Sequence, residues 1–424
     1  MRVLIVAQYY TPDITAAAFR IAETAELLSA WGHEVVVVTA EPHRVRAEDP
    51  SGSAPRGGQA VGASGSLPGP GSTGPTVRRV PIDPLEGSGL KPYLHHYFSF
   101  VLRARKEGRR VIKEGFRPDV VWVSSPPLFV GLVGPALRRA GRSLLWGHRP
   151  RFVLDIRDVW PDTAVAAGQI SQGSSAYKVG RFLESWLYRR CEALSCVAAP
   201  MGEYLQGASG KEVAVVYNGV SEATLPQAGG SGGDGRREIL YAGNLGRLQG
   251  LDVLLEAWSR VRDEPFFQEW TLRLLGSGVI EDVLREQIRQ LQLEGRVVID
   301  PPVAKPQALA AMEEAGLLFL NLRPDPVFEY TIPSKLFDYL RAGRPIVGGI
   351  PGEGAAILRE TGGNATFPPG DVDGLEEALR HVAADYEEMR HRAAGNTLLV
   401  RERFTREAAT RRLEELFRRV AGTS

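Results

Sequence analysis

Apolar runs and amphipathic stretches alternate from the first residues of the chain. The unbroken apolar run RVLIVAQYY predicts a buried strand, residues 16–31 predict a helix that ends at Gly32, and HEVVVVTA predicts a second strand. A strand–helix–strand unit of this kind crosses over with a right hand and forms a parallel sheet, which binds ligands beyond the carboxyl ends of its strands. We therefore expect the loop from Tyr9 to Ala18 to lie near a site.

The same alternation continues through the rest of the chain. A strand, a turn and a helix are predicted for PDVVWVSSPPLFVGLVGPALRRAG, and a further helix for residues 176–193. The later segments EILYAGNLGRLQGLDVLLEAW, TLRLLGSG and VVIDPPVAKPQALAAMEEAGLLFLNL again combine strands with glycine turns or helices. With 424 residues, the chain is long enough for two domains of about 200 residues each. The pattern predicts an α/β fold with two Rossmann-like domains.

Two segments lack this pattern. Residues 49–76 are rich in Gly, Ser and Pro and bury too little apolar surface to become ordered, so they predict a flexible loop within the first domain. Residues 226–235 predict a similar loop early in the second domain. From about residue 372 the chain reads as helical, with apolar residues three or four positions apart, and it ends in a structural helix.

Composition, charge and motifs argue against several classes of protein. The formal net charge of +1 argues against nucleic acid as the main partner, since a nucleic-acid binder collects a basic excess on one face. Two cysteines, Cys191 and Cys196, predict a reducing compartment without a disulfide frame or zinc cluster. No apolar run reaches the length of a membrane span, and the start lacks the core of a signal peptide, so we expect a cytoplasmic protein. The first loop lacks G-x-G-x-x-G, which weakens the case for a dehydrogenase.

Residues 321–354 contain the largest group of candidate ligand-binding residues. A buried strand, LLFLNLRP, leads through a Pro-containing loop to a helix opened by Ser334, Lys335 and Asp338. Backbone N–H groups at such a helix start have no internal partner and favour a phosphate, to which a hydroxyl and a cation add. Asp338, one turn further, can accept hydrogen bonds from the hydroxyls of a ribose. Taken alone, the same residues also fit a solvated helix surface.

Glycine turns and an acidic cluster supply further candidates. Gly243 and Gly276 follow predicted strands, and glycine lets the backbone approach a phosphate closely, although such turns are not specific on their own. The cluster DIRDVWPD, which contains Asp158, fits either a salt-linked loop or polar groups that face a crevice at the end of a strand.

These segments resemble retaining GT-B glycosyltransferases of family 4. PSKLFDYLRAGRPIVGG is similar to that family's nucleotide-sugar signature, in which Asp338 takes the second acidic position and Tyr330, beside Glu329, takes the first. YAGNLGRLQG is similar to the G-N-x-G-x-x-Q-G of a branch that builds bacterial surface polysaccharides of the O-antigen and colanic-acid type, where Asn244 and Gln249 replace an Arg and a Lys of the wider family. DIRDVWPD is similar to the D-x-x-D-L-W-P of the same branch, as are QYYTPD and SSPPLFVGL.

The resemblance covers nearly the whole chain and implies its organisation and activity. It implies an acceptor-binding domain at residues 1–200, a nucleotide-sugar-binding domain at 201–400, a deep cleft between them, and a C-terminal helix at 401–424 that crosses back to the first domain. The implied reaction transfers a hexosyl or N-acetylhexosaminyl group from a nucleoside diphosphate sugar, here a UDP-sugar, to a glycan or polyprenyl-diphosphate-linked acceptor with retention of configuration. It implies neither a cofactor nor a metal.

The resemblance also implies roles for individual residues. Lys335 and Arg247 would stabilise the departing diphosphate, Glu329 would lie beside the sugar, and Asp158 would orient the acceptor, with Asp155 as a weaker candidate. The remaining donor contacts are expected from Gly243, Asn244, Gly276, Val303 after Pro302, Tyr330, Ser334 and Asp338.

Residues 93–115 combine aromatic residues with six lysines and arginines. Basic amphipathic helices with aromatic residues bind anionic membranes, so this segment predicts a peripheral contact with the inner face of the plasma membrane. The same pattern also fits a helix that covers the sheet and exposes a solvated basic face.

Two other functions fit the same fold. A nucleotide-sugar epimerase would need an acid and a base at the sugar ring and no acceptor. A non-catalytic subunit that binds nucleotide sugars would explain the replaced Arg, Lys and first Glu. The DIRDVWPD and Gln249 matches argue against the epimerase, and release of a nucleoside diphosphate would exclude the binding subunit.

Overall fold

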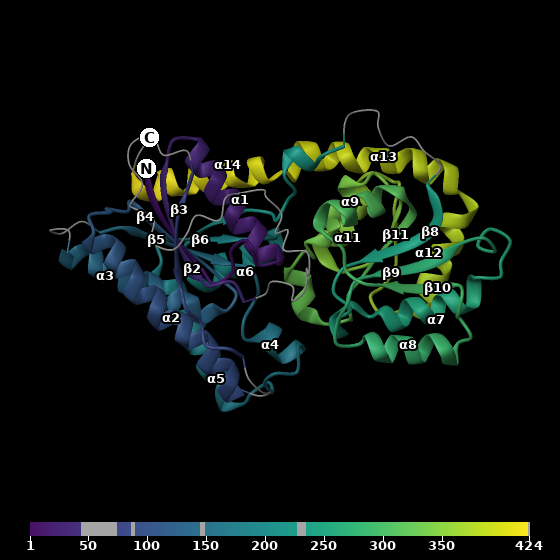
Figure 1. The fold of residues 1–424 in the computed structure, drawn as a ribbon, viewed down its shortest axis with the longest axis horizontal. Coiled ribbons are helices and arrows are strands. Elements are labelled where there is room, and N and C mark those ends of the chain that lie inside the picture. The colour runs from purple at the N-terminus through teal and green to yellow at the C-terminus, as the bar shows by residue number, and fades with distance from the viewer. Residues whose placement is uncertain (44–73, 86–89, 145–148, 227–234, 423–424) are drawn as a thin grey trace, which may run out of the picture. The chain divides into compact units, whose positions relative to one another are not determined.

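The computed structural model describes residues 1–43, 74–85, 90–144, 149–226 and 235–422 (Figure 1). The loops predicted at 49–76 and 226–235 therefore lie almost wholly outside the described residues. The chain forms two units. Unit 1 consists of Met1–Tyr217 and Arg406–Ser424, and unit 2 consists of Asn218–Thr405.

Unit 1 is built on a parallel sheet of seven described strands in the order β3-β2-β1-β4-β5-β6-β7. Their bounds are β1 Arg2–Ala7, β2 Glu34–Ala40, β3 Thr76–Val80, β4 Val120–Ser124, β5 Arg151–Ile156, β6 Ala193–Cys196 and β7 Glu212–Val215. The first unit extends past the predicted boundary at residue 200 because β7 completes its sheet. Strand β3 is missing from the sequence-based prediction, since two arginines interrupt its apolar pattern in TVRRV.

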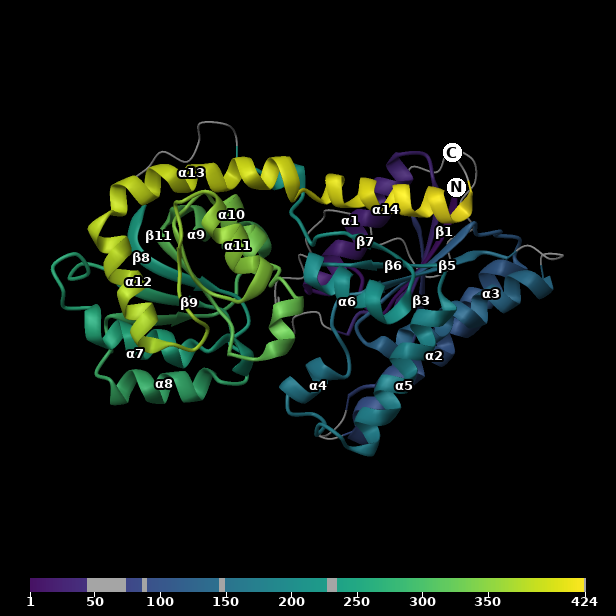
Figure 2. The ribbon, with the colours of Figure 1, turned by 180° about the vertical axis from the view of Figure 1, so that it is seen from behind.

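The helices of unit 1 flank this sheet (Figures 1 and 2). They are α1 Ala16–Ala30, α2 Leu90–Lys113, the 3₁₀ helix η1 Leu128–Leu132, α3 Val133–Leu144, α4 Asp162–Ala166, α5 Ser175–Arg190, α6 Ala199–Ser209 and α14 Arg406–Ala421. Helix α1 begins where the hydroxyl of Thr15 accepts a hydrogen bond from the Ala18 amide, at 3.1 Å. It ends before Gly32, whose φ of +87° suits glycine.

The C-terminal helix α14 packs against α1 and the sheet of unit 1, as the GT-B resemblance implies. Its apolar side buries Leu413, Leu416 and Phe417 in the unit 1 core. The polar residue Glu414 of the same helix lies 2.9 Å from Nε2 of His33. Apolar burial and this hydrogen bond attach the last residues of the chain to its first domain.

Unit 2 contains a second parallel sheet, with described strands in the order β10-β9-β8-β11-β12-β13. The strands are β8 Arg236–Ala242, β9 Thr271–Leu275, β10 Val297–Asp300, β11 Ala315–Asn321, β12 Ile346–Gly349 and β13 Ala365–Thr366. The helices are η2 Glu222–Thr224, η3 Arg247–Gln249, α7 Leu251–Val261, α8 Glu281–Gln290, α9 Lys305–Glu314, η4 Pro326–Tyr330, α10 Lys335–Arg341, α11 Gly352–Glu360, α12 Val372–Ala384 and α13 Tyr386–Arg403.

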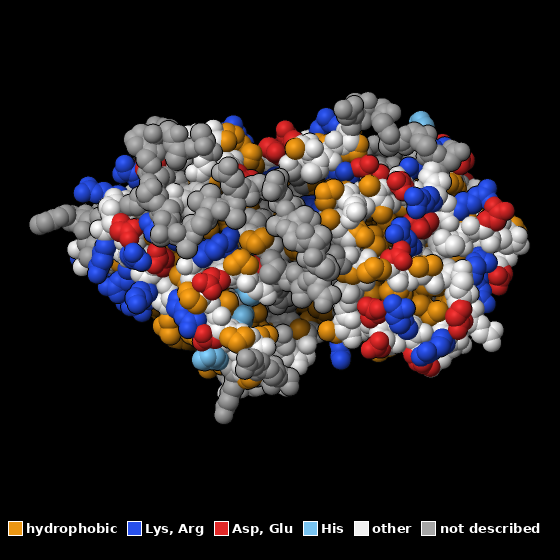
Figure 3. All heavy atoms as spheres, in the orientation of Figure 1, with side chains coloured by type: hydrophobic (Ala, Val, Ile, Leu, Met, Phe, Trp, Pro, Cys, Tyr) orange, Lys and Arg blue, Asp and Glu red, His pale blue; other side chains and the backbone are white. Residues whose placement is uncertain are grey.

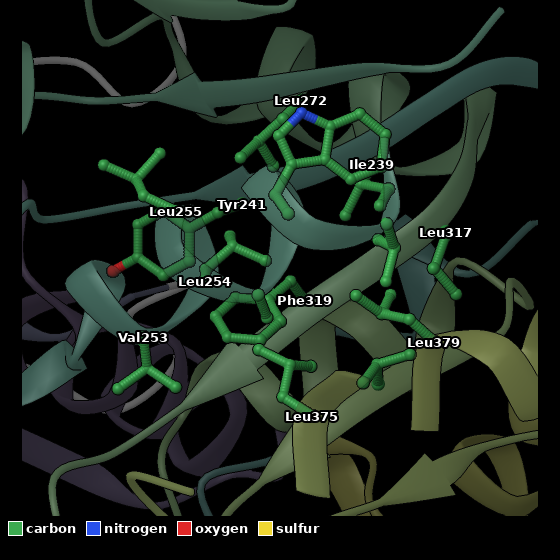
Figure 4. Close-up of a cluster of buried hydrophobic side chains, with 14 of the residues drawn as sticks. Ile239, Tyr241, Val253, Leu254, Leu255, Leu272, Leu317, Phe319, Leu375 and Leu379 are labelled. Carbon is green, nitrogen blue, oxygen red and sulfur yellow. The ribbon is translucent and has the colours of Figure 1, made fainter. Parts of the chain in front are cut away.

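The core of unit 2 joins β8, β9 and β11 to α7 and α12 (Figure 4). Ile239, Leu254, Phe319 and Leu379 are completely buried in it. Tyr241, at the carboxyl end of β8, belongs to the same cluster and carries a hydroxyl group to the edge where the loops begin. Because all these strands are parallel, the loops after β8, β9, β10 and β11 emerge at one edge of the sheet.

Candidate functional site

The loops after β8 and β9 meet backbone to backbone at that edge. The amide of Gly243 donates to the carbonyl oxygen of Leu275 at 2.9 Å, and Leu245 donates to Ser277 at 2.9 Å. A Cβ atom on Gly276 would lie 1.9 Å from the carbonyl oxygen of Gly243, which leaves room only for glycine. The two predicted glycines are therefore brought together, and we call the paired backbone of their loops the glycine surface.

Lys335 crosses from α10 to this glycine surface. A Cβ atom on Gly243 would lie 2.2 Å from Cε of Lys335, so the lysine side chain occupies the space that the glycine leaves. Its ammonium group donates to the Tyr241 hydroxyl and lies 4.0 Å from the centre of that ring. Tyr241 in turn donates to the carbonyl oxygen of Asn244 at 2.6 Å. Lys335 and the turn after β8 are thus one connected polar cluster.

The charge of Lys335 has no carboxylate partner among the residues that the structure describes. Burial lowers the pKa of its ammonium group to about 7. A cation that is partly removed from water and lacks a counter-ion is energetically unfavourable in the protein alone. Such an arrangement becomes favourable when an anion binds beside it.

A neighbouring tyrosine holds α10 in place. The Tyr339 hydroxyl accepts a hydrogen bond from the amide of Ala242 at 2.8 Å, which joins the middle of α10 to the end of β8. Burial raises the pKa of Tyr339, so this group stays protonated. Sequence analysis did not select Tyr241 or Tyr339, because the tyrosines of YAGN and FDYL look like ordinary core residues. Ser334 lies at the start of α10 without a capping hydrogen bond from its side chain.

The turn η3 is fixed by the last residue of β11 and by a residue that follows it. The side-chain amide of the buried Asn321 donates to the carbonyl oxygens of Gln249 and Gly250, at 3.3 and 3.1 Å. The guanidinium of Arg323 donates to the carbonyl oxygen of Arg247 at 2.8 Å. The backbone of the turn is thereby held, while the side chain of Arg247 is exposed. Asn244 is exposed as well.

The remaining predicted donor residues lie along the same edge of the sheet. Val303, in the loop after β10, is 36% exposed, and Glu329 and Tyr330 end the short helix η4 after β11. A Cβ atom on Gly352 would lie 2.8 Å from Oε2 of Glu329, so this carboxylate reaches the start of α11. Asp338 is half-buried, one turn along α10 from Lys335.

The acidic cluster of unit 1 separates into two kinds of carboxylate. Asp155 is fully buried and accepts hydrogen bonds from Arg20 at 2.5 Å and from Ser124 and Ser195 at 2.7 Å each. It is part of the core, which removes it as a contact for an acceptor. Asp158, three residues on, lines a cavity of 130 Å³ instead.

The cavity beside Asp158 is an open hollow between α2, α4 and the segments that follow β4 and β5. Its lining residues are Tyr93, Ser125, Pro126, Pro127, Leu128, Asp158, Trp160, Thr163, Ala164, Ala167 and Gln169. Burial raises the pKa of Asp158, and the nearby Arg157 partly opposes that effect. A carboxyl group with a raised pKa inside a small cavity can accept a hydrogen bond or a proton from a hydroxyl group.

The two parallel sheets, with glycine loops at the carboxyl edge of the sheet of unit 2, define the class of two-domain Rossmann-like α/β proteins. The model of the glycosyl transferase 4-like domain matches residues 15–219, and that of glycosyl transferases group 1 matches residues 236–385. The chain therefore belongs to the GT-B glycosyltransferases of family 4.

Named relatives agree with this assignment. The colanic acid biosynthesis glycosyl transferase WcaI of Escherichia coli is 26% identical over 366 residues, which are 81% of this chain and 82% of WcaI. The glycosyltransferase WbjE of Pseudomonas aeruginosa is 28% identical over 284 residues, 63% of this chain and 66% of WbjE. The structure of HepE from Anabaena, solved with UDP and glucose, superposes with a TM-score of 0.64 at 16% identity and covers 98% of this chain and 99% of that one. An epimerase or a binding subunit is not favoured by these matches.

Proposed function

We propose that the protein transfers a hexosyl or N-acetylhexosaminyl group from a UDP-sugar to a glycan or polyprenyl-diphosphate-linked acceptor, with retention of configuration, in the synthesis of a bacterial surface polysaccharide. The observation that carries this proposal is Lys335, a cation without a carboxylate partner among the described residues, set against the glycine loops of unit 2. The relative WcaI supports a role in polysaccharide synthesis, WbjE supports glycosyl transfer, and HepE with UDP supports the donor class.

The diphosphate of the donor is proposed to lie on the glycine surface. Glycine at 243 and 276 lets the two loops and the side chain of Lys335 pack against one another, which gathers the ammonium group and the loop backbone in one place for the phosphates. As the bond between the sugar carbon and the diphosphate oxygen breaks, negative charge grows on the leaving group. Lys335 stabilises that charge, with the exposed Arg247 and the hydroxyl of Ser334 as further donors. The chain thus supplies the cation itself, and we expect a chelator such as EDTA to leave turnover unchanged.

Other residues at the same edge are assigned by their positions. Asp338 would hold the ribose hydroxyls, the backbone at Val303 would meet the base, and Asn244 would contact the phosphates. Glu329 or Tyr330 would lie beside the sugar.

The acceptor is proposed to bind in unit 1, with its hydroxyl group directed to Asp158. The cavity of 130 Å³ there is large enough for part of one sugar ring but not for a nucleotide. The raised pKa of Asp158 lets its carboxyl group take up the proton that the attacking hydroxyl loses. We propose that the reaction takes place in the cytoplasm, at the inner face of the plasma membrane.

A donor screen followed by a turnover assay tests the proposal. UDP, GDP, ADP and dTDP with their common sugars are added to the purified protein, and a selective rise in melting temperature with UDP compounds is expected. Lipid-linked acceptors are then supplied, and release of UDP together with an anomer of unchanged configuration is measured by NMR. Lys335→Ala should lower kcat by about 10² to 10³-fold, as loss of one preorganised donor does.

The exposed lysine Lys113 provides a matched control, because Lys113→Ala also removes one cation and should leave kcat unchanged. Equal turnover in Lys335→Ala and the native protein would overturn the assignment of Lys335. UDP release that requires no acceptor and yields an isomerised UDP-sugar would instead identify an epimerase.

A further inference from the structure

Unit 1 carries a second and larger hollow, which shares no lining residue with the cavity beside Asp158. It has a volume of 510 Å³ and lies between α2 and α3, with Trp186 of α5 at its side. We call it the α2–α3 groove. It is lined by Phe98, Val101, Leu102, Arg105, Arg109, Leu132, Pro135, Ala136, Arg139, Ala140, Ser143 and Trp186. The lining therefore combines an apolar floor with three arginines and contains no carboxylate.

The arginines of the groove differ from their neighbours on the same helices. Arg103 and Arg110 of α2 pair with Asp83 at 2.7 Å and Glu114 at 2.9 Å, and Arg138 of α3 pairs with Glu192 at 2.6 Å. By contrast, no ion pair joins any of the three groove arginines to a residue that the structure describes. Those three are Arg105, Arg109 and Arg139, and all are exposed. Their positive charge is available to an anion from outside the chain.

Large apolar side chains are exposed beside these charges. Leu102, at the rim of the groove, is 62% exposed, and Val179 and Phe182 of α5 are 65% and 67% exposed. Val179, Phe182 and Trp186 follow a three- and four-residue spacing, which puts them on one face of α5. In Figure 3, basic side chains gather over the region where Figure 1 places α2 and α3, with hydrophobic side chains beside them.

We propose that the α2–α3 groove binds an anionic lipid of a bilayer surface, with a hydrocarbon chain along the apolar floor and the lipid phosphate between the three arginines. Leu102, Val179 and Phe182 would then enter the headgroup region. A free phosphate would use the arginines and leave the apolar floor in water, and a nucleic acid would not explain the exposed aliphatic residues. A lipid matches the whole groove, because its hydrocarbon chain fits the apolar floor and its phosphate fits the arginines.

This inference deepens the proposed function, on which its biological purpose rests, because an enzyme that glycosylates lipid-linked sugars must reach a membrane. Binding itself requires no sugar transfer. None of the helices in the described part of the chain combines the length and apolar character of a membrane span. The surface formed by α2, α3 and α5 would therefore be a peripheral contact, and it extends the predicted role of residues 93–115 to two further helices.

Vesicle sedimentation with the full chain tests the inference. The protein is mixed with vesicles of phosphatidylcholine alone or of phosphatidylcholine with phosphatidylglycerol, and the bound fraction is measured across salt concentrations. Each arginine near an anionic surface contributes about fivefold to the partition coefficient, so the triple variant Arg105→Gln, Arg109→Gln, Arg139→Gln should lose about 100-fold. Leu102→Ser with Phe182→Ser should weaken the part of binding that persists at high salt.

A second triple variant separates local from overall charge. Arg117→Gln, Arg151→Gln and Arg359→Gln remove the same net charge from exposed positions outside the groove and outside residues 93–115, and this variant should bind vesicles nearly as well as the native protein. Equal losses in the two triple variants would overturn the proposal in favour of net charge. Full competition by inorganic phosphate, or stronger retention on RNA than on vesicles, would overturn it in favour of those ligands.

The failure of this inference can be distinguished from failure of the proposed function. The melting-temperature rise with UDP depends on unit 2 and should be the same in the groove variant and the native protein. If the native protein binds anionic vesicles but its melting temperature rises with no nucleotide, the proposed function is wrong and the lipid-binding inference is supported. A protein that responds to UDP and ignores anionic vesicles would do the reverse.

Discussion

Asp155 of unit 1 and Lys335 of unit 2 are both charged groups withdrawn from water, but their surroundings differ. In unit 1, Asp155 is fully buried, with Arg20 at 2.5 Å and the hydroxyls of Ser124 and Ser195 at 2.7 Å. In unit 2, Lys335 is half-buried, and its polar contact is a neutral tyrosine hydroxyl. The first charge is balanced within the fold, and the second is not.

The difference separates a structural role from a binding role. A buried charge that is paired and hydrogen-bonded is strongly destabilising only when its partner is removed. A cation without a partner is unfavourable in the free protein and gains when an anionic ligand arrives. We therefore expect substitutions at Asp155 and at Lys335 to have opposite effects on stability and different effects on activity.

The largest expected effect is on unit 1. Asp155→Ala leaves the guanidinium of the buried Arg20 without its counter-ion, which should lower the free energy of unfolding by about 3–5 kcal/mol. Chemical denaturation followed by tryptophan fluorescence measures the loss, since Trp122 lies in the same cluster and donates to Ser195. The folded fraction should keep its response to UDP. A loss below about 1 kcal/mol would show that Arg20 finds another partner.

The second effect is on Lys335, and its sign for stability is reversed. Lys335→Met keeps the length of the side chain and removes the unfavourable charge, so the free energy of unfolding should rise by about 0.5–2 kcal/mol, as at other strained functional sites. Turnover should fall by about 10² to 10³-fold in the same protein. Lower stability together with unchanged turnover would assign Lys335 to the fold and make it equivalent to Asp155.

The third effect concerns the glycine surface on which Lys335 lies. Gly276→Ala puts a Cβ atom 1.9 Å from the carbonyl oxygen of Gly243 at a φ of +158°, so the loops after β8 and β9 must move apart. We expect a stability loss of about 1–3 kcal/mol and loss of the melting-temperature rise with UDP. Gly32→Ala is the control, since it has a positive φ but open space around its Cβ position. A UDP response that survives in Gly276→Ala would contradict the proposed diphosphate position.

The sequence predicts most of the strands and the donor side of unit 2, but it does not predict which charged residues are paired. Apolar runs identify most strands of both sheets, and the spacing of Gly243, Gly276 and Lys335 around those strands indicates the donor side of unit 2. The contrast between Asp155 and Asp158 is not predictable from the motif, because both are carboxylates of DIRDVWPD. It arises from Arg20, 135 positions earlier, whose side chain reaches Asp155 only in the folded sheet. Pairing across such separations depends on topology, which residue patterns do not encode.

The α2–α3 groove illustrates the same limit. Its arginines are visible as a basic run in the sequence, but the sequence does not separate Arg105 and Arg109 from Arg103 and Arg110. Ion pairs with Asp83 and Glu114 make that distinction in the structure. A charge pattern predicts that a face is basic, whereas the folded neighbours decide which charges remain available.

The smallest and most specific effect is on pH dependence, through the titration of Lys335. With a pKa of about 7 in the free enzyme, Lys335 loses its proton as pH rises through neutrality, so kcat/KM for the donor should fall about tenfold per pH unit above that point. The value of kcat should hold to higher pH, because a bound diphosphate keeps the ammonium protonated.

The stability of the protein should depend on the same group. The pKa of Lys335 in the folded protein lies below the ordinary 10.5, so the unfolded chain binds more protons between about pH 7 and 10.5. The free energy of unfolding should therefore rise with pH across that window. Lys335→Met should abolish this rise, and a flat profile of kcat/KM in the native enzyme from pH 6 to 9 would show that the cation of Lys335 takes no part in donor binding.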